Sequence, residues 1–189
     1  MENYYQRNMD QLDDCNNGKL SYNQLLDYYF NEDSGEPTEP VTLEEAKNFC
    51  KIDVDDDDTL ITSLITAARR MCEDYTNIGF IKREVTAVIN NGNGGSYLPF
   101  GPIGEIVSVT DIDGNEIDAD IQGVQWKQVV SPRLERMTVV YSGGYEVLPN
   151  DLKTALLNVI MWLYDNRSQG TTEMGPIAPM ILNPVKRIW

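Results

Sequence analysis

The pattern of apolar and polar positions divides the chain into helical stretches on either side of a long stretch with the period of β-strands. Between residues 56 and 76 apolar side chains recur every three or four positions, which predicts an amphipathic helix with one buried face. A shorter helix is predicted over 42–51, and the helical period returns over 150–167. Pro149 favours a helix that begins there, because its fixed φ and missing N–H cost little at a first turn.

Polar residues mark where the first two helices begin. Thr42 followed by Glu45 has the spacing of a capping box, in which each residue bonds to the backbone of the other. Four consecutive aspartates, Asp55 to Asp58, precede the second helix. A cation site is one interpretation of this run. We favour the other, because a carboxylate at a helix N-terminus is stabilised by roughly 0.3 to 1 kcal/mol.

From residue 83 to residue 145 the period of the pattern falls to two. Val85, Ala87 and Ile89 alternate with polar residues, and Asp113-Gly114-Asn115 has the composition of a hairpin turn. Further strands are predicted over 96–98, 105–112, 116–121, 124–130 and 137–141. Short strands at this spacing favour a small antiparallel barrel or sandwich. The expected fold class is therefore α+β, a small helical bundle with an inserted β barrel or sandwich and an extended C-terminal tail.

Two terminal segments are predicted to lie outside a connecting domain over 41–170. Residues 1–40 carry nine acidic and two basic side chains and end in a polar, proline-containing stretch that indicates a linker. Within this acidic extension only residues 20–30 hold enough apolar side chains for a short helix.

Residues 171–189 contain three prolines and show no periodicity. Their apolar side chains have nothing local to pack against, so we expect an extended docking tail that binds a partner protein. The alternative is that the tail folds back on its own bundle. The expected docking residues are Ile181, Leu182, Val185, Lys186, Arg187, Ile188 and Trp189.

Composition lowers the expectation of catalysis. The chain has no histidine, which removes the usual general base and the commonest transition-metal ligand. Cys15, Cys50 and Cys72 form no close pair, and the last two lie on predicted apolar helix faces. The net charge of −15 should repel nucleic acid at long range. No apolar run reaches the roughly 18 to 20 residues that cross a bilayer, so we expect no membrane insertion.

Three local motifs suggest sites that their surroundings argue against. Residues 13–24 have the register of a calcium-binding EF-hand loop, but Cys15 and Gln24 occupy positions that require oxygen ligands. The glycine-rich stretch 90–95 joins two predicted strands, so a hairpin is favoured over a phosphate loop. The acids Asp111, Asp113, Asp118 and Asp120 lie at turns, where solvated charge is favoured over acid–base catalysis.

The order of several stretches resembles the head-to-tail connector, or adaptor, family of tailed bacteriophages. Leu43-Glu44-Glu45-Ala46-Lys47, the aspartate run and Leu60 to Arg69 resemble the opening helices of that family. The further stretches that agree in order are 98–103, 107–109, 139–145 with Leu148-Pro149, 155–167 and 181–187. The resemblance covers residues 41–189 and leaves residues 1–40 as an addition.

This resemblance implies a structural virion protein at the head–tail interface, assembled in the host cytoplasm and without enzymatic activity or cofactor. It implies a ring of, we expect, twelve copies beneath the portal protein that extends the DNA channel. The implied partners are the portal, copies of the chain itself, the next tail or stopper protein, and double-stranded DNA that passes without specific binding. Two alternatives stay open: a stopper or tail-completion protein, and a calcium- or carbohydrate-binding module.

Overall fold

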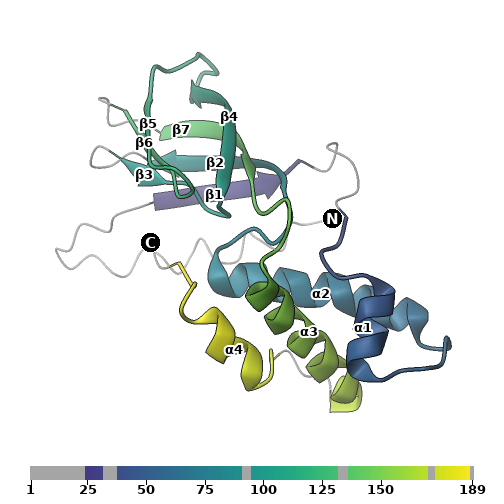
Figure 1. Cartoon of the computed structure of the whole chain (residues 1–189). Helices are drawn as coiled ribbons and strands as arrows, with labels where there is room; N and C mark the ends of the chain where they lie inside the picture. The colour runs from purple at the N-terminus through teal and green to yellow at the C-terminus, as the bar shows by residue number, and fades with distance from the viewer. Residues whose placement is uncertain (1–23, 32–37, 91–94, 132–135, 170–172, 188–189) are drawn as a thin grey trace.

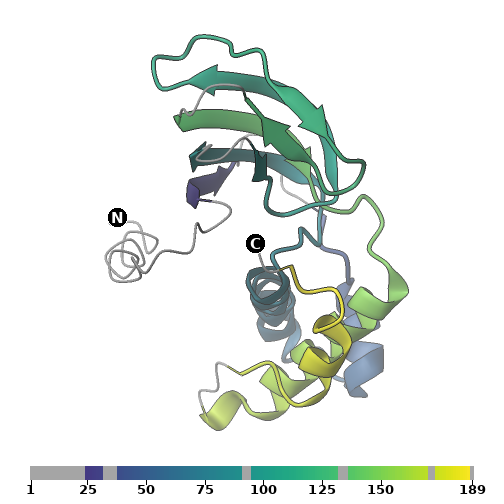
Figure 2. The same ribbon diagram turned by 90° about the vertical axis from the view of Figure 1, so that its left-hand side faces the viewer.

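The chain folds into a helical lobe and a β lobe, joined by short connections (Figure 1). The computed structural model describes residues 24–31, 38–90, 95–131, 136–169 and 173–187. In Figure 1 the helices lie below and the strands above, and Figure 2 shows the two lobes from the side.

The helical lobe contains α1 (Leu43–Cys50), α2 (Asp58–Thr76), α3 (Asn150–Asp165), a 3-10 turn (Arg167–Gln169) and α4 (Ile177–Leu182). The first three lie where the sequence predicts them. The capping box is present, because the Glu45 N–H donates to Thr42 Oγ1 at 3.1 Å and the Thr42 N–H donates to Glu45 Oε2 at 3.0 Å. Small side chains let the helices approach closely, and Ala68 and Ala155 are fully buried in their shared core.

The β lobe consists of two antiparallel sheets. A four-stranded sheet has the order β1-β2-β7-β4, and a three-stranded sheet has the order β3-β6-β5. The strands are β1 (Gln24–Phe30), β2 (Arg83–Asn90), β3 (Ser96–Tyr97), β4 (Ile103–Asp111), β5 (Asp120–Gln122), β6 (Gln128–Val130) and β7 (Arg136–Gly143). Buried side chains of both sheets, among them Val139 and Val129, form one core. The α+β fold and the sandwich are confirmed, whereas no closed barrel is found in the described part of the chain.

Two predicted strands are much shorter in the structure. The strands expected over 116–121 and 124–130 are reduced to the three-residue strands β5 and β6. Gly123 lies between them with a φ of 98°, and a Cβ there would approach the Trp126 carbonyl oxygen to 2.3 Å. The chain turns tightly at this point, so the alternation of apolar and polar residues does not continue as a ladder.

The helix predicted over 20–30 is wrong, because residues 24–30 form the edge strand β1. β1 pairs antiparallel with β2, with Tyr28 opposite Ala87 and Phe30 opposite Val85. The rings of Tyr28 and Phe30 lie 4.7 and 5.1 Å from the ring of Phe100. Aromatic side chains on alternate positions fit a half-buried sheet surface better than a short isolated helix. The domain boundary at residue 40 stays a prediction, although β1 adds to the β lobe.

Candidate docking surfaces

The C-terminal segment 173–187 lies on the helical lobe, so the fold-back alternative is the one that the structure shows. Ala178 and Leu182 of α4 are fully buried against the bundle, mainly against α3. The extended conformation predicted for the tail is therefore wrong over α4. The sequence offered no periodicity here because a helix of six residues spans less than two turns.

Hydrogen bonds fix the residues after α4 to the end of α2. The Arg187 N–H donates to the Thr76 carbonyl oxygen at 2.9 Å, and the Asn77 side-chain amide donates to the Arg187 carbonyl oxygen at 2.8 Å. The Tyr75 hydroxyl donates to Asn183 Oδ1 at 2.5 Å. Three consecutive residues at the C-terminal end of α2 thus hold the tail.

Two cations of the tail lie over aromatic rings. The Lys186 ammonium is 4.1 Å from the centre of the Tyr75 ring, and the Arg187 guanidinium is 4.3 Å from that of Trp126. Trp126 belongs to the β lobe, so Arg187 connects the two lobes. Both cations are half-buried and keep part of their surface in solvent.

The predicted docking residues therefore divide into three groups. Leu182 is in the core and cannot contact a partner without unfolding α4. Ile181, Val185, Lys186 and Arg187 are half-buried. Ile188 and Trp189 lie outside the described residues.

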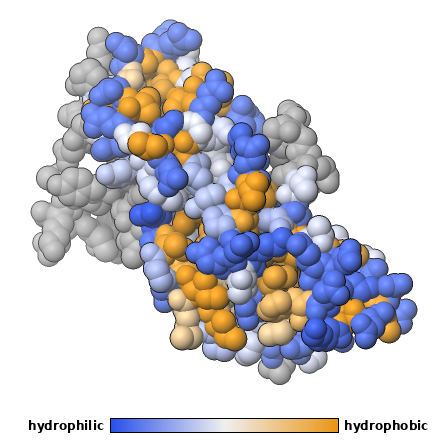
Figure 3. Space-filling view, viewed as in Figure 1, coloured by the Kyte–Doolittle hydropathy of each residue, from blue (hydrophilic) through white to orange (hydrophobic). Residues whose placement is uncertain are grey.

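The exposed apolar side chains of α4, which the prediction did not include, are Ile177 and Met180, at 47% and 75% exposure. Figure 3 shows apolar residues gathered over the part of the bundle where α4 lies.

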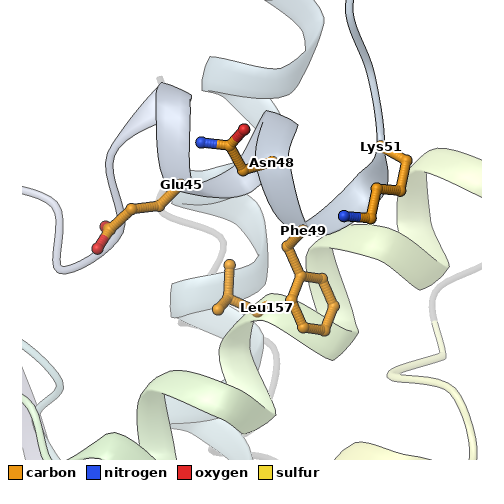
Figure 4. A pocket seen from close by; sticks show the side chains of 5 residues that line it. All are labelled: Glu45, Asn48, Phe49, Lys51 and Leu157. Atoms are coloured by element: carbon orange, nitrogen blue, oxygen red, sulfur yellow. The ribbon is translucent and has the colours of Figure 1, made fainter.

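A shallow groove between α1 and α3 forms a second candidate surface (Figure 4). Phe49 and Leu157 provide its apolar surface, Lys51 lies at one end and Glu45 at the other, and its volume is about 580 Å³. Lys153 of α3 binds Glu45 at 2.6 Å and so ties the two helices together. Sequence reasoning missed this groove, because it combines residues more than a hundred positions apart.

The aspartate run anchors the neighbouring helices through its side chains, and Asp57, the N-cap residue of α2, makes no side-chain capping hydrogen bond. The Lys47 ammonium contacts Asp55 at 2.6 Å and Asp58 at 2.7 Å. Its hydrogen bond lowers the pKa of Asp55 below the ordinary value. The Tyr164 hydroxyl donates to Asp57 at 2.5 Å. Throughout the described ranges, no group of three or more acidic or thiol side chains is arranged to hold a metal ion.

A buried charge network joins the two lobes. Arg69 of α2 contacts Glu73 at 2.8 Å and Glu39 of the linker at 2.8 Å, and Arg83 of β2 contacts Glu73 at 2.8 Å. The other Glu73 oxygen accepts a hydrogen bond from the Phe80 N–H at 2.8 Å. Burial lowers the pKa of Arg69, but its two carboxylate partners outweigh that effect and leave the pKa raised. Arg69 and Arg83 thus share the Glu73 carboxylate, and Glu39 adds a second carboxylate partner for Arg69.

The remaining candidate chemical groups have structural roles. Asp111 accepts backbone hydrogen bonds from Asp113 and Asn115, and its bonds to Asn115 lower its pKa. Burial raises the pKa of the Cys72 thiol to about 12 and that of Cys50 above its usual value, so neither is a ready nucleophile. Residues 13–23 of the EF-hand-like loop and residues 91–94 of the glycine-rich turn fall in ranges that the structure does not describe, and Gln24 is the first residue of β1. No described helix is long and apolar enough to span a membrane.

Comparison with known proteins adds one sequence family and several similar folds. Residues 40–131 match the family of phage gp6-like head-tail connector proteins. No curated protein sequence matches the chain significantly. A chain from the neck of an empty gene transfer agent particle, computed with C6 symmetry, aligns with a TM-score of 0.69 at 15% identity, over 87% of this chain and 97% of that one.

Two further similar chains come from native gene transfer agent particles. One belongs to a virion and has a TM-score of 0.64 at 16% identity, over 79% of this chain and 91% of that one. The other belongs to a neck computed with C12 symmetry and has a TM-score of 0.54 at 15% identity, over 67% of this chain and 83% of that one. At these identities the likeness is one of fold.

Proposed function

We propose that the chain, whose residues 40–131 match the family of phage gp6-like head-tail connector proteins, is an adaptor subunit of this family between the portal and the tail. The observation that carries this proposal is the family match itself. It spans α1, α2 and the strands β2 to β6, which are the first part of the stretches on which the resemblance rests. The proposed location is the virion, at the head–tail interface, with assembly in the host cytoplasm.

We propose that copies of the chain form a ring. The similar chains in gene transfer agent necks come from structures computed with six-fold and twelve-fold symmetry, which supports a ring as the working assembly. A twelve-fold ring under the portal is the specific form we expect. A subunit that repeats around an axis needs one surface for the preceding copy and a different surface for the next.

The proposed portal contact is the end of the C-terminal segment. Val185 and Arg187 are half-buried, and residues 188 and 189 follow them directly. An Arg beside apolar side chains is a common composition for the centre of a protein interface. Leu182 is excluded from this contact by its burial, so the proposed surface begins after α4.

The acidic composition supports a role in DNA passage. With a net charge of −15, the subunit should repel a polyanion rather than hold it. A ring of such subunits would extend the DNA channel without specific binding.

The chain's acids also have structural partners, such as Lys47 at Asp55 and Asn115 at Asp111, which supports the proposal that the protein is not an enzyme. The next tail or stopper protein is the proposed partner on the other side of the ring.

The test is to image the full-length protein mixed with its portal complex by negative-stain electron microscopy. We expect an added ring of density on the tail side of the portal. Arg187→Glu should reduce the fraction of portals that carry this ring, and Arg136→Glu, an exposed charge on β7, should not. Circular dichroism of both variants checks that the fold is intact. Absence of any added ring from the wild-type mixture would contradict the adaptor role, whereas full occupancy by Arg187→Glu would contradict only the docking surface.

A further inference from the structure

The helical lobe presents two unlike apolar surfaces on opposite flanks. In Figure 1, α3 lies between α4 on one side and α1 on the other. The α4 flank is a ridge, formed by the exposed side chains of Ile177 and Met180. The α1 flank is the groove of Phe49 and Leu157. Exposed apolar surfaces of this kind commonly mark binding sites.

The ridge is neutral and stands out from the bundle. Ile177 and Met180 are three positions apart in α4, so they share the outer face of the helix. Ala178 and Leu182 face the bundle and fix the helix in place. No charged residue occurs between Glu173 and Lys186. The ridge therefore offers apolar surface without a charge that would have to be buried with it.

The groove has a matching form. Its apolar residues Phe49 and Leu157 lie between polar groups at the two ends (Figure 4). Phe49 is 36% exposed although it belongs to the first helix of the bundle. A ridge of aliphatic side chains would remove this aromatic surface from water, which stabilises a contact in proportion to the apolar area buried.

The charges beside the two surfaces are opposite in sign. The loop that follows α1 carries Asp53, Asp55 and Asp56, all exposed, which outnumber the exposed Lys51 at the end of the groove even though Asp55 is paired with Lys47. Lys186 lies beside α4, at the other end of the bundle, with its ammonium over the Tyr75 ring and part of its surface in solvent. The acidic loop is at the far right of Figure 1 and the C-terminal segment at the left. The two apolar surfaces thus come with complementary charges.

We propose that the α4 ridge of one copy binds in the α1–α3 groove of the next copy, with Lys186 facing the acidic loop of that neighbour. This inference deepens the proposed function, because it names the contact that would build the ring. A head-to-tail contact between unlike surfaces generates a ring when its rotation closes. The partner of each surface is a second copy of the chain. The ridge complements the groove, and every copy carries both.

The first experiment tests the apolar half of the contact in full-length protein. Met180→Asp should reduce self-association, measured by sedimentation velocity of concentrated protein without portal, by at least about tenfold. The same variant should give incomplete rings on the portal. Ile112→Asp is the matched control, because Ile112 is 74% exposed against 75% for Met180 but lies in the β lobe. Its self-association should equal that of the wild type.

The second experiment tests the charges by exchange. Lys186→Glu and Asp56→Lys should each weaken self-association about fivefold through like-charge contact, and the two substitutions together in one chain should restore it. Lys82→Glu, an exposed charge elsewhere, should have no effect. If the single substitutions weakened self-association by damaging the fold, the double variant would associate more weakly still. Restored self-association therefore indicates a direct contact between the two charges.

The outcomes separate this inference from the adaptor role. If Met180→Asp associates like the wild type, or if the double charge exchange fails to restore association, the ridge–groove contact is wrong even where wild-type rings form on the portal. If the variants behave as expected in solution while the wild type adds no ring to the portal, the contact stands and the adaptor role is wrong. Wild-type protein that associates neither in solution nor on the portal contradicts both.

Discussion

Glu73 illustrates how single residues connect the two lobes. Its side chain is 3% exposed, yet it binds Arg69 and Arg83 and accepts the Phe80 N–H. Arg83 also stacks its guanidinium 3.4 Å from the centre of the Phe30 ring, so the network reaches β1. Burying such charges is costly in itself, and breaking a buried pair costs more because one charge is left without its partner.

We therefore expect Glu73→Gln to lower the free energy of unfolding by about 3 to 5 kcal/mol. The substitution keeps an oxygen for the Phe80 N–H but removes the charge that Arg69 and Arg83 share. Urea unfolding at neutral pH measures the change. Glu105→Gln, an exposed acid on β4, is the control and should change stability by less than about 0.5 kcal/mol. Equal stabilities for the two variants would show that the network contributes little.

Among the helices and strands, the sequence predicts those in which the apolar residues of the buried face repeat with the helical or strand period. The helices α1 to α3 and the strand β2 meet this condition, and Thr42 with Glu45 also marks a start. β1 does not, because its strand conformation depends on pairing with β2 and on packing against Phe100, which lie elsewhere in the sequence. α4 does not either, because only Ala178 and Leu182 of its six residues are fully buried. Both elements depend on distant partners that no local pattern reveals.

The pairing of β1 leads to a prediction about truncation. Removing residues 1–31 should lower the free energy of unfolding by several kcal/mol, because Phe100 and β2 lose the aromatic side chains and hydrogen bonds of an edge strand. Removing residues 1–22 leaves β1 complete and should have little effect. Thermal unfolding of the two shortened proteins provides the comparison. Identical melting temperatures would mean that the whole extension is separable from the fold.

α4 gives a matched pair of substitutions in one helix. Leu182→Ala should destabilise the protein by about 2 to 5 kcal/mol, because it leaves a cavity at a fully buried position. Met180→Ala, two residues away but 75% exposed, should stay within about 0.5 kcal/mol of the wild type. Urea midpoints report both values. A small effect of Leu182→Ala would indicate that the C-terminal segment is not part of the folded bundle in solution.

At the scale of the whole molecule, the sequence led to the family and the α+β fold but not to the complete set of surfaces. The order of short stretches along the chain indicated the family, and the family model matches residues 40–131, which hold the first of these stretches. The groove at Phe49 and Leu157 needs α1 and α3 to be adjacent, which only the folded chain establishes. Leu182 is the opposite case. The sequence placed this apolar residue at an interface, whereas the fold buries it in the protein's own core.

Assembly should depend on the portal: the isolated protein should be a monomer or small oligomer at micromolar concentration and should form rings only with the portal. Each exposed apolar surface offers few large side chains, chiefly Ile177 and Met180 on one flank and Phe49 on the other. Stable interfaces bury about 800 Å² per partner, and association must also offset the lost freedom of each copy. A portal that binds many copies side by side raises their effective concentration and so favours ring closure. Light scattering after gel filtration, with and without portal, measures the mass, and a stable twelve-subunit ring of the isolated protein would contradict the need for the portal.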